Sequence, residues 1–330
     1  PIIQHVVELF PGVDDVVFIC NDTHLEDPAL GLRQLLLGLV PNARVVSIAP
    51  HRLGPVHAVL EALRTPGLLD PSRPVIVNYC DFACRWDFDH FVRFVRETEC
   101  DGCIPCYSGF HPHMLGSVNY AYVDVFRDAS GEPTLWGRRI QEKRPFTDDP
   151  MAEYASSGTY YFRTAELMTQ CFHEVVARGL EVSGEYYVSM AYTPLFEASR
   201  AVAVYPLAHF MQWGTPEDLD EYRYWSDTFR ELAQRPRPRA EQQGTTLIPM
   251  AGTGSRFTAL TGVPKPLIEV AGVPMALRAL ADLPSAPQQR FVLGAHLADA
   301  EELRSQLASA SRAASFRVLA GPTDGQASTC

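Results

Sequence analysis

The stretch Val16-Val17-Phe18-Ile19-Cys20-Asn21-Asp22 is an apolar run that ends in two polar residues. A run that is apolar on both faces is typical of a buried strand in a parallel sheet. Residues 74–81 repeat the pattern and end in Asp81, and helix-like stretches at 30–39 and 56–63 lie between the two runs. This alternation predicts an α/β fold with a mostly parallel sheet covered by helices.

Polar residues and a glycine mark the predicted strand ends. In parallel sheets, ligands bind at the carboxyl ends of the strands. Asn21, Gly54 and Asp81 all follow strand-like segments, and Gly54 is followed by Pro55, a residue favoured at the first position of a helix. We therefore expect the binding site to lie near these positions.

Composition narrows the classes of partner. The chain has 330 residues, and 28 Lys and Arg against 39 Asp and Glu give a formal net charge of −11. An acidic chain without a basic run is a poor candidate for binding nucleic acid or a membrane surface. The longest apolar stretches, such as 35–40, are far shorter than the ~18 residues of a membrane span. We therefore expect small-molecule partners, no nucleic acid and no membrane insertion.

Eight cysteines raise the question of a metal site. Cys100, Cys103 and Cys106 have the spacing C-x2-C-x2-C, which also occurs in iron–sulfur and zinc sites. No fourth ligand is evident, and residues 103–106 have the pattern of a short apolar strand, which favours buried, reduced, structural cysteines. Reduced cysteines indicate a reducing compartment, the cytoplasm.

The chain also contains a repeat and a linker. Residues 234–244 are polar and rich in proline, which is typical of a linker. Beyond it, the order of helix-like and strand-like segments from Pro274 to Gly325 matches the order from Pro1 to Gly54. Pro274 lies 273 residues after Pro1, and Gly325 lies 271 residues after Gly54, so the spacing drifts by two residues. We predict two copies of one domain, both incomplete.

A glycine-rich loop follows the strand-like residues 246–250. It reads Gly252-Thr253-Gly254-Ser255-Arg256, and Pro264-Lys265-Pro266 comes shortly after it. Glycines after a strand let backbone N–H groups approach phosphate oxygens, and Arg256 and Lys265 could neutralise a polyphosphate. No G-K-[ST] follows, so this is not a Walker loop. We predict that Gly252, Thr253, Gly254 and Ser255 bind the phosphates of a nucleotide.

Asp81 is the second candidate for the chemistry. A carboxylate at the mouth of a parallel sheet suits Mg²⁺, which prefers a few protein oxygens together with phosphate. The alternative is an ordinary helix N-cap or surface acid.

Residues 250–270 resemble the N-terminal signature of the sugar-phosphate nucleotidylyltransferases, the NDP-sugar pyrophosphorylases. Six later motifs of that family resemble segments of the first copy, at 54–58, 77–82, 142–143, 156–162, 184–187 and 212–219. The resemblance implies a Rossmann-like, GT-A-type α/β fold with a mixed, mostly parallel sheet, helices on both faces and a partial second copy. Residues 1–233 would form a domain without its first strand and Gly-rich loop, 234–244 a linker, and 245–330 the start of a second domain.

The resemblance also implies a role for each site residue. Asp81 would bind Mg²⁺, Arg256 and Lys265 would stabilise the departing pyrophosphate, and Gly54 and His57 would contact the nucleotide. The acceptor would be bound by Glu142, Lys143, Gly158 and Glu185. Many members carry a second metal-binding Asp where this chain has Gln212, and a neutral amide is a weaker magnesium ligand.

The implied reaction is the magnesium-dependent transfer of a nucleotidyl group from an NTP to a sugar phosphate or similar acceptor. Pyrophosphate is released, and the product would be a precursor of surface polysaccharide. A homo-oligomer is a further expectation. Two other classes stay open: a non-catalytic regulatory or scaffold relative, which Gln212 favours, and a GT-A glycosyltransferase. Asp81-Phe82-Ala83 lacks the D-x-D pattern typical of the latter.

The two copies can be arranged in two ways. In the first, the chain is a window on a longer tandem enzyme, and residues 252–265 serve a second site. In the second, residues 246–273 fold back to supply the strand and loop that the first copy lacks.

Overall fold

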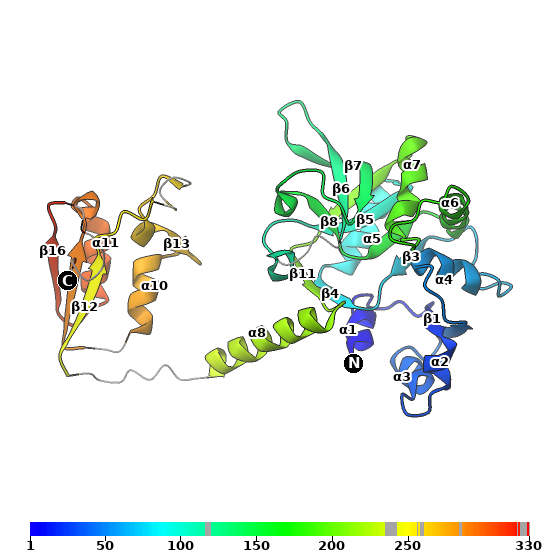
Figure 1. Ribbon diagram of the computed structural model, residues 1–330, viewed down its shortest axis with the longest axis horizontal. Coiled ribbons are helices and arrows are strands. Elements are labelled where there is room, and N and C mark those ends of the chain that lie inside the picture. Colours follow the sequence, from blue (N-terminus) through cyan, green and yellow to red (C-terminus); the bar gives the residue numbers. More distant parts are fainter. Residues whose placement is uncertain are drawn as a thin grey trace. The chain divides into compact units, whose positions relative to one another are not determined.

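The computed structural model describes residues 1–115, 120–234, 243–255, 257, 261–283, 286–321, 323 and 329. The chain divides into two compact units, Pro1–Ser226 and Asp227–Cys330, called the first and second unit below (Figure 1). In the described ranges, no helix combines the length and the apolar character needed to cross a bilayer. Most of the predicted linker lies outside these ranges.

The first unit contains most of the secondary structure. Its helices are α1 (Ile2–Val7), α2 (Asp22–Glu26), α3 (Leu32–Leu39), α4 (Pro55–Ala62), α5 (Phe88–Glu97), α6 (Ala165–Ala177), α7 (Thr193–Glu197) and the start of α8 (Pro216–Gln234), with short 3-10 turns η1 (Pro112–Leu115), η2 (Pro150–Ala152) and η3 (Ser189–Tyr192). Its strands are β1 (Val17–Asn21), β2 (Arg44–Ile48), β3 (Val75–Asn78), β4 (Phe82–Arg85), β5 (Gly102–Tyr107), β6 (Ala121–Arg127), β7 (Pro133–Glu142), β8 (Tyr154–Ser156), β9 (Thr159–Phe162), β10 (Val202–Pro206) and β11 (His209–Gln212).

Seven of these strands form one mixed sheet, in the order β10-β7-β6-β8-β5-β9-β3. Only β5 and β10 pair in parallel among its described strands, and the other pairings are antiparallel. The expectation of a mostly parallel sheet is therefore wrong here. One reason is local: β6 and β7 are joined by a tight turn in which the Gly131 N–H bonds to the Asp128 carbonyl, and so short a connection makes strands antiparallel.

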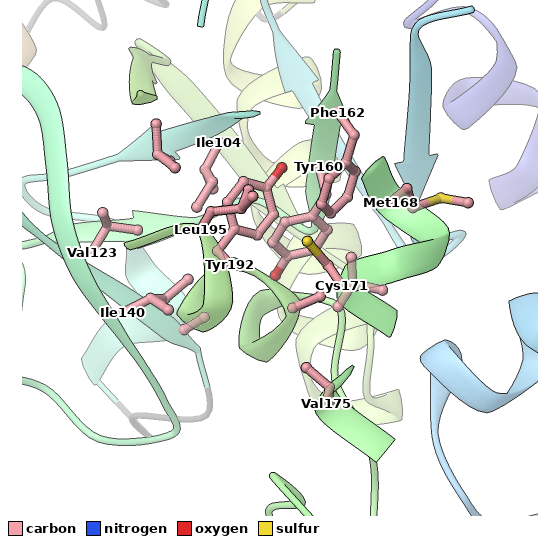
Figure 2. Close-up of a cluster of buried hydrophobic side chains, with 14 of the residues drawn as sticks. Ile104, Val123, Ile140, Tyr160, Phe162, Met168, Cys171, Val175, Tyr192 and Leu195 are labelled. Carbon is pink, nitrogen blue, oxygen red and sulfur yellow. The ribbon is translucent and has the colours of Figure 1, made fainter. Parts of the chain in front are cut away.

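Helices cover both faces of this sheet, as alternation along β5 shows. Ile104 and Cys106 pack in the cluster that contains α6 and η3 residues, and Figure 2 shows Ile104 beside Tyr192 and Leu195 in it. Cys103 and Tyr107 pack in a second cluster with Phe91 of α5. Successive side chains of a strand point to opposite faces, so each face of β5 has its own apolar layer.

The same alternation decides between the two interpretations of the cysteine motif. Cys103 and Cys106 are three residues apart on β5 and belong to the clusters on opposite faces of the sheet. They therefore cannot bind one ion together. Both side chains are fully buried, as expected for structural cysteines.

The first two strands form a separate small sheet. β1 and β2 pair in parallel, from Val17 opposite Arg44 to Asn21 opposite Ile48. β1, α3 and α4 confirm the strand and the two helices predicted in this region to within two residues. The second predicted strand is shorter than expected: β3 ends at Asn78, and residues 82–85 form β4, which pairs with β11.

The second unit holds a three-stranded parallel sheet. Its strands are β12 (Thr245–Met250), β15 (Gln288–Leu293) and β16 (Ala314–Val318), with β15 in the centre. The remaining elements are η4 (Lys265–Leu267), the β13–β14 hairpin (Glu269–Val270 and Val273–Pro274), α10 (Met275–Asp282), η5 (Ala295–Leu297) and α11 (Glu301–Ser309). Both units thus contain a parallel strand pair joined through a helix.

Candidate functional site

Asp81 lies in the turn between β3 and β4, beside the end of β11. Its carbonyl accepts a hydrogen bond from the Trp213 N–H at 2.9 Å, and Phe82 pairs with Gln212 across the two strands. A Cβ atom on Gly214 would lie 3.1 Å from Asp81 Oδ2 and 2.6 Å from Gln212 Nε2. The carboxylate and the amide therefore meet over the glycine, and a larger residue would displace them.

A third polar side chain, Asp218, affects the pKa of Asp81. Burial raises the pKa of the Asp81 carboxyl group, its own backbone N–H lowers that pKa, and the nearby Asp218 raises it further. Asp218 is anchored at the start of α8, where its backbone N–H and Oδ2 both bond to Thr215 Oγ1, at 3.1 and 2.8 Å. Two acids beside the side-chain amide of Gln212 form a set of polar groups that suits a hard cation.

The protein would supply few ligands to such a cation. In the part of the chain that the structure describes, no group of three or more His, Cys, Asp or Glu is arranged to hold a metal ion. Mg²⁺ is commonly bound through one or two carboxylates, with substrate phosphates completing its coordination. The residues around Asp81 therefore fit Mg²⁺ better than a metal that needs a full protein cage.

Lys143 lies at the end of β7 in a strained conformation. Its φ is +56°, an uncommon value for a residue other than glycine. The ammonium donates a hydrogen bond to the Tyr187 hydroxyl at 2.6 Å and lies 4.6 Å from the centre of that ring. Tyr187 in turn donates to the Glu185 carboxylate. The phenol thus holds the lysine in one position.

Glu142 precedes this lysine and has a separate partner. Ser189 donates a hydrogen bond to its carboxylate at 2.5 Å. Burial raises the pKa of Glu142, while the Ser189 hydroxyl and Lys143 lower it and Glu185 raises it. The structure therefore brings together three of the four predicted acceptor-binding residues: Glu142, Lys143 and Glu185.

Gly158, the fourth of these residues, shapes the chain beside Tyr79. Its φ is +90°, and a Cβ atom would lie 3.1 Å from Tyr79 Cδ2. Its carbonyl accepts a hydrogen bond from the Tyr79 N–H at 3.0 Å. Gly158 thus fixes the segment that leads to Asp81.

Gly54 and His57 lie at the start of α4. A Cβ atom on Gly54 would lie 2.7 Å from the Tyr186 backbone N, so the glycine permits close contact between two turns. His57 packs against His51, with ring centres 4.6 Å apart, and its Nε2 lies 3.6 Å from a Glu61 oxygen. Both predicted nucleotide-contacting residues thus follow the carboxyl end of β2.

The glycine-rich loop belongs to the second unit. Gly252, Thr253, Gly254 and Ser255 follow β12, whereas Arg256 lies outside the described residues. A Cβ atom on Gly254, whose φ is +62°, would lie 2.9 Å from Lys265 Cβ, so the loop and the lysine are adjacent.

This segment packs with the residues that follow it. β12 pairs with β15, and Leu267 packs against the cluster that contains Leu280 of α10. The fold-back arrangement would separate residues 246–273 from residues 274–330, and the structure instead joins them.

Three side chains were not singled out from the sequence. Tyr187 and Ser189 hold Lys143 and Glu142, and Asp218 acts on Asp81. Tyr187 and Asp218 lie within motifs at 184–187 and 212–219, but nothing in the sequence shows which residues they contact. Lys143 and Tyr187 are 44 positions apart in the sequence, so no local pattern reveals their contact.

The sequence profile of the MobA-like NTP transferase domain matches residues 1–146. No match was found among curated proteins. Among solved structures, the nucleoside-diphosphate-sugar pyrophosphorylase from Vibrio cholerae RC9 is similar, with a TM-score of 0.52 and 18% identity over 66% of this chain and 84% of that one. A UDP-glucose pyrophosphorylase in its apo form gives a TM-score of 0.50 and 12% identity, over 70% of this chain and 88% of that one. Residues 1–146 thus match the profile of an NTP transferase domain, and the fold of the chain is similar to that of these two solved pyrophosphorylases.

Proposed function

We propose that the chain transfers a nucleotidyl group from an NTP to a phosphorylated small molecule, a sugar phosphate or a similar acceptor, and releases pyrophosphate. The observation that carries the proposal is the convergence of Asp81 and Gln212 over Gly214, next to an acid at the start of α8. The match of residues 1–146 to an NTP transferase domain supports it. A role in making surface-polysaccharide precursors is part of the same proposal.

The proposed reaction needs little general acid or general base catalysis from side chains. The attacking phosphate oxygen of the acceptor is already an anion, so the chain's task is to position the reactants and offset their charge. Lys143, held by Tyr187, would bind the acceptor phosphate through a charge-assisted hydrogen bond. Asp81 would hold Mg²⁺, which when bound supplies positive charge to phosphate oxygens.

In this proposal the glycine-rich loop of the second unit would bind nucleotide phosphates at a second site of the same kind. Gly252, Thr253, Gly254 and Ser255 would bind the triphosphate through backbone N–H groups, and Arg256 and Lys265 would offset the charge of the departing pyrophosphate. The contact of Gly254 with Lys265 supports this assignment. The second unit would then be the start of a second domain of the same kind.

Strand registers support that repeat. Val17 pairs with Arg44, 27 residues later, and Gln289 pairs with Ala314, 25 residues later. This difference of two residues equals the two-residue change in spacing found between the matched segments 1–54 and 274–325.

The experiment is an assay of pyrophosphate release. The chain would be incubated with Mg²⁺, each of the common NTPs and a panel of sugar phosphates and choline-type phosphates. We expect release with at least one pair of substrates, and Asp81→Asn should abolish it. Asp89→Asn is the matched control, because Asp89 is an exposed acid in the first turn of α5.

Gln212 favours a second candidate, a non-catalytic regulatory relative. An amide replaces a carboxylate beside Asp81, which weakens metal binding. Under this alternative the chain binds nucleotide without releasing pyrophosphate. In that case Gln212→Asp would create pyrophosphate release. A chain that is itself a nucleotidyl transferase would already release pyrophosphate without the substitution.

A further inference from the structure

His113 is a polar side chain of the first unit to which the proposed function gives no role. It lies in η1, between β5 and β6, and is partly buried. The Tyr107 hydroxyl and the His113 Nε2 are 3.1 Å apart and share a hydrogen bond. The other ring nitrogen, Nδ1, is not fully buried and has no hydrogen-bond partner among the described residues. That nitrogen is therefore open to a ligand.

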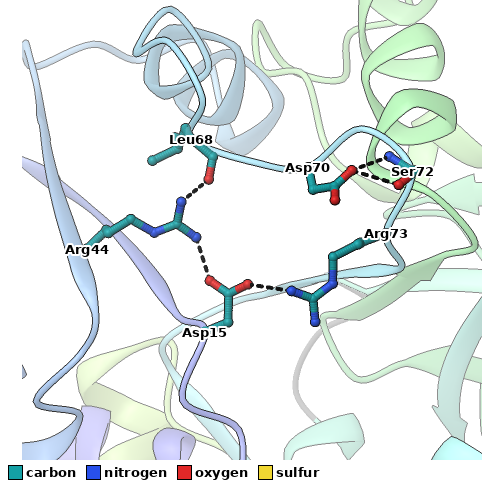
Figure 3. Close-up of polar contacts among 6 residues, drawn as sticks. All are labelled: Asp15, Arg44, Leu68, Asp70, Ser72 and Arg73. Atoms are coloured by element: carbon teal, nitrogen blue, oxygen red, sulfur yellow. Dashed lines mark hydrogen bonds and ion pairs between the residues drawn. The ribbon is translucent and has the colours of Figure 1, made fainter.

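A polar cluster elsewhere in this unit is, by contrast, closed within the chain. Asp15 accepts a hydrogen bond from Arg44 at 2.5 Å, and its other carboxylate oxygen lies 3.4 Å from Arg73 (Figure 3). Each of these charged groups is satisfied by another residue of the chain. His113 instead leaves one ring nitrogen unused.

Aromatic rings hold the imidazole of His113 in one orientation. The rings of Tyr107, Tyr120 and Phe210 meet it edge to face, with their centres 5.5, 5.1 and 5.4 Å from its own. Tyr107 and Phe210 are stacked on each other at 4.3 Å, and all three residues are buried. A side chain that is fixed by packing and by one hydrogen bond presents its free atom at a defined place, as specific recognition requires.

One of these rings connects His113 to the Asp81 side of the candidate site. Phe210 lies on β11, two residues before Gln212, and its ring centre is 5.4 Å from that of Phe82. Phe82 directly follows Asp81 and pairs with Gln212 across β4 and β11. Two packed rings therefore lead from the imidazole to the turn that carries Asp81.

Tyr120 connects the same imidazole to the lysine that would bind the acceptor phosphate. The Lys143 N–H donates to the Tyr120 carbonyl at 2.9 Å, beside the pairing of β6 with β7. The ring of Tyr120 packs against His113. His113 is thus linked by direct packing to both sides of the candidate site.

Asp218 is a charged group that acts on both sides. Burial, followed by His111, lowers the pKa of His113 from 6.5 to about 4, and Asp218 opposes this change. Burial is also the main cause of the raised pKa values of Tyr120 and Asp81, and Asp218 raises both further. These three side chains therefore lie around the start of α8. At neutral pH the imidazole is uncharged, so it can form hydrogen bonds but cannot neutralise a phosphate.

We propose that His113 determines acceptor specificity, because its imidazole hydrogen-bonds a hydroxyl group on the body of the acceptor whose phosphate Lys143 binds. The position of that phosphate rests on the proposed function. An uncharged imidazole close to an acid favours a neutral polar group over a second anionic one. A hydroxyl group both donates and accepts, so it suits Nδ1 in either tautomer. A site built to hydrogen-bond a hydroxyl group discriminates against an analogue without it, since the polar group of the protein is then left unpaired.

Equilibrium binding to the full chain tests this contact without turnover. Isothermal titration calorimetry would compare the glycosyl phosphates of glucose, mannose and galactose, ribitol phosphate, phosphocholine and cyclohexyl phosphate. Cyclohexyl phosphate has a ring and a phosphate but no hydroxyl group. We expect at least one polyhydroxylated phosphate to bind about tenfold or more tightly than cyclohexyl phosphate and phosphocholine.

Two substitutions separate a contact with the acceptor from a structural role. In His113→Gln the amide reaches the position of Nε2 and can keep the bond to Tyr107, but the group at Nδ1 is lost. In His113→Asn the amide replaces Nδ1, and the bond to Tyr107 is lost. We expect His113→Gln to abolish the preference over cyclohexyl phosphate, by weakening only the polyhydroxylated ligand, and His113→Asn to retain part of it. The matched control is His173→Gln, at an exposed histidine of α6.

Four outcomes would overturn the proposal. The first is equal affinity of the unchanged chain for cyclohexyl phosphate and every polyhydroxylated phosphate, and the second is tightest binding of phosphocholine. The third is a preference that survives in His113→Gln, above all if His113→Asn loses it, because His113 would then only support Tyr107. The fourth is that no phosphate of the panel binds. Failure of the proposed function alone gives a different result, in which the preference depends on His113 but no pyrophosphate is released.

Discussion

Replacing Gly54 by alanine should destabilise the first unit more than the same change at an open glycine. Gly54 has a φ of +85°, and an added Cβ would lie 2.7 Å from the Tyr186 N and 2.8 Å from the Tyr186 O. The Tyr186 N–H donates to the Leu53 carbonyl at 2.9 Å, and the Val56 N–H donates to the Tyr186 carbonyl at 3.1 Å. The added methyl group must therefore break contacts between two backbone segments.

Gly12 provides the matched control. Its φ is +78°, but a Cβ there would meet no atom within 4 Å. Alanine at Gly12 costs about 1–2 kcal/mol for its positive φ. At Gly54, whose ψ is 175°, alanine costs about 1–3 kcal/mol, because that combination of φ and ψ is nearly restricted to glycine. Gly54→Ala also overpacks its contact, at about 1–3 kcal/mol. The effect of the substitution on the unfolded chain is similar at both sites and cancels in the comparison.

Urea denaturation followed by tryptophan fluorescence measures the difference. The chain has four tryptophans, Trp86, Trp136, Trp213 and Trp225, and all belong to the first unit. We expect Gly54→Ala to lower the free energy of unfolding by about 1–3 kcal/mol more than Gly12→Ala does. Equal losses would refute the close contact between the Gly54 turn and residues 185–186.

Three further predictions concern the site and its surroundings. Lys143→Met should raise the KM for the phosphorylated acceptor by about 10- to 100-fold in steady-state kinetics, because it removes a charge-assisted hydrogen bond; an unchanged KM would exclude this role. Tyr187→Phe should raise the same KM by a smaller factor and leave thermal stability nearly unchanged, since it removes the bond that positions Lys143; a large loss of stability would instead indicate a structural role. Burial, followed by His111, lowers the pKa of His113 from 6.5 to about 4, so the unfolded chain binds more protons in this range and stability should fall as pH drops from 6.5 towards 4. His113→Gln should reduce that slope in urea titrations, and an unaltered slope would show that other groups cause it.

Local patterns in the sequence predict the β1–α4 region well. Val17–Asn21 is an apolar run that ends in a polar residue, three of the five residues of Arg44–Ile48 are apolar, and Pro55 marks the start of a helix, so each element is determined by its own residues. Asp81 could be identified for the same reason, because it follows an apolar run directly. The residues that matter most to these predictions are neighbours in sequence.

Features that depend on distant contacts could not be predicted. The antiparallel sheet arises from pairings such as Val75 with Phe162, which lie far apart in the chain. Tyr187 reaches Lys143 only because the end of β7 lies beside residues 185–189. Neither contact leaves a periodic pattern in the sequence.

Pyrophosphate release by the full chain, with Mg²⁺, an NTP panel and phosphorylated acceptors, tests the Asp81 site most directly. We expect release with at least one substrate pair, and a loss of about 100-fold or more with Asp81→Asn but not with Asp89→Asn. Release that is unaffected by Asp81→Asn, or no release with any pair, would show that the Asp81 site does not support nucleotidyl transfer.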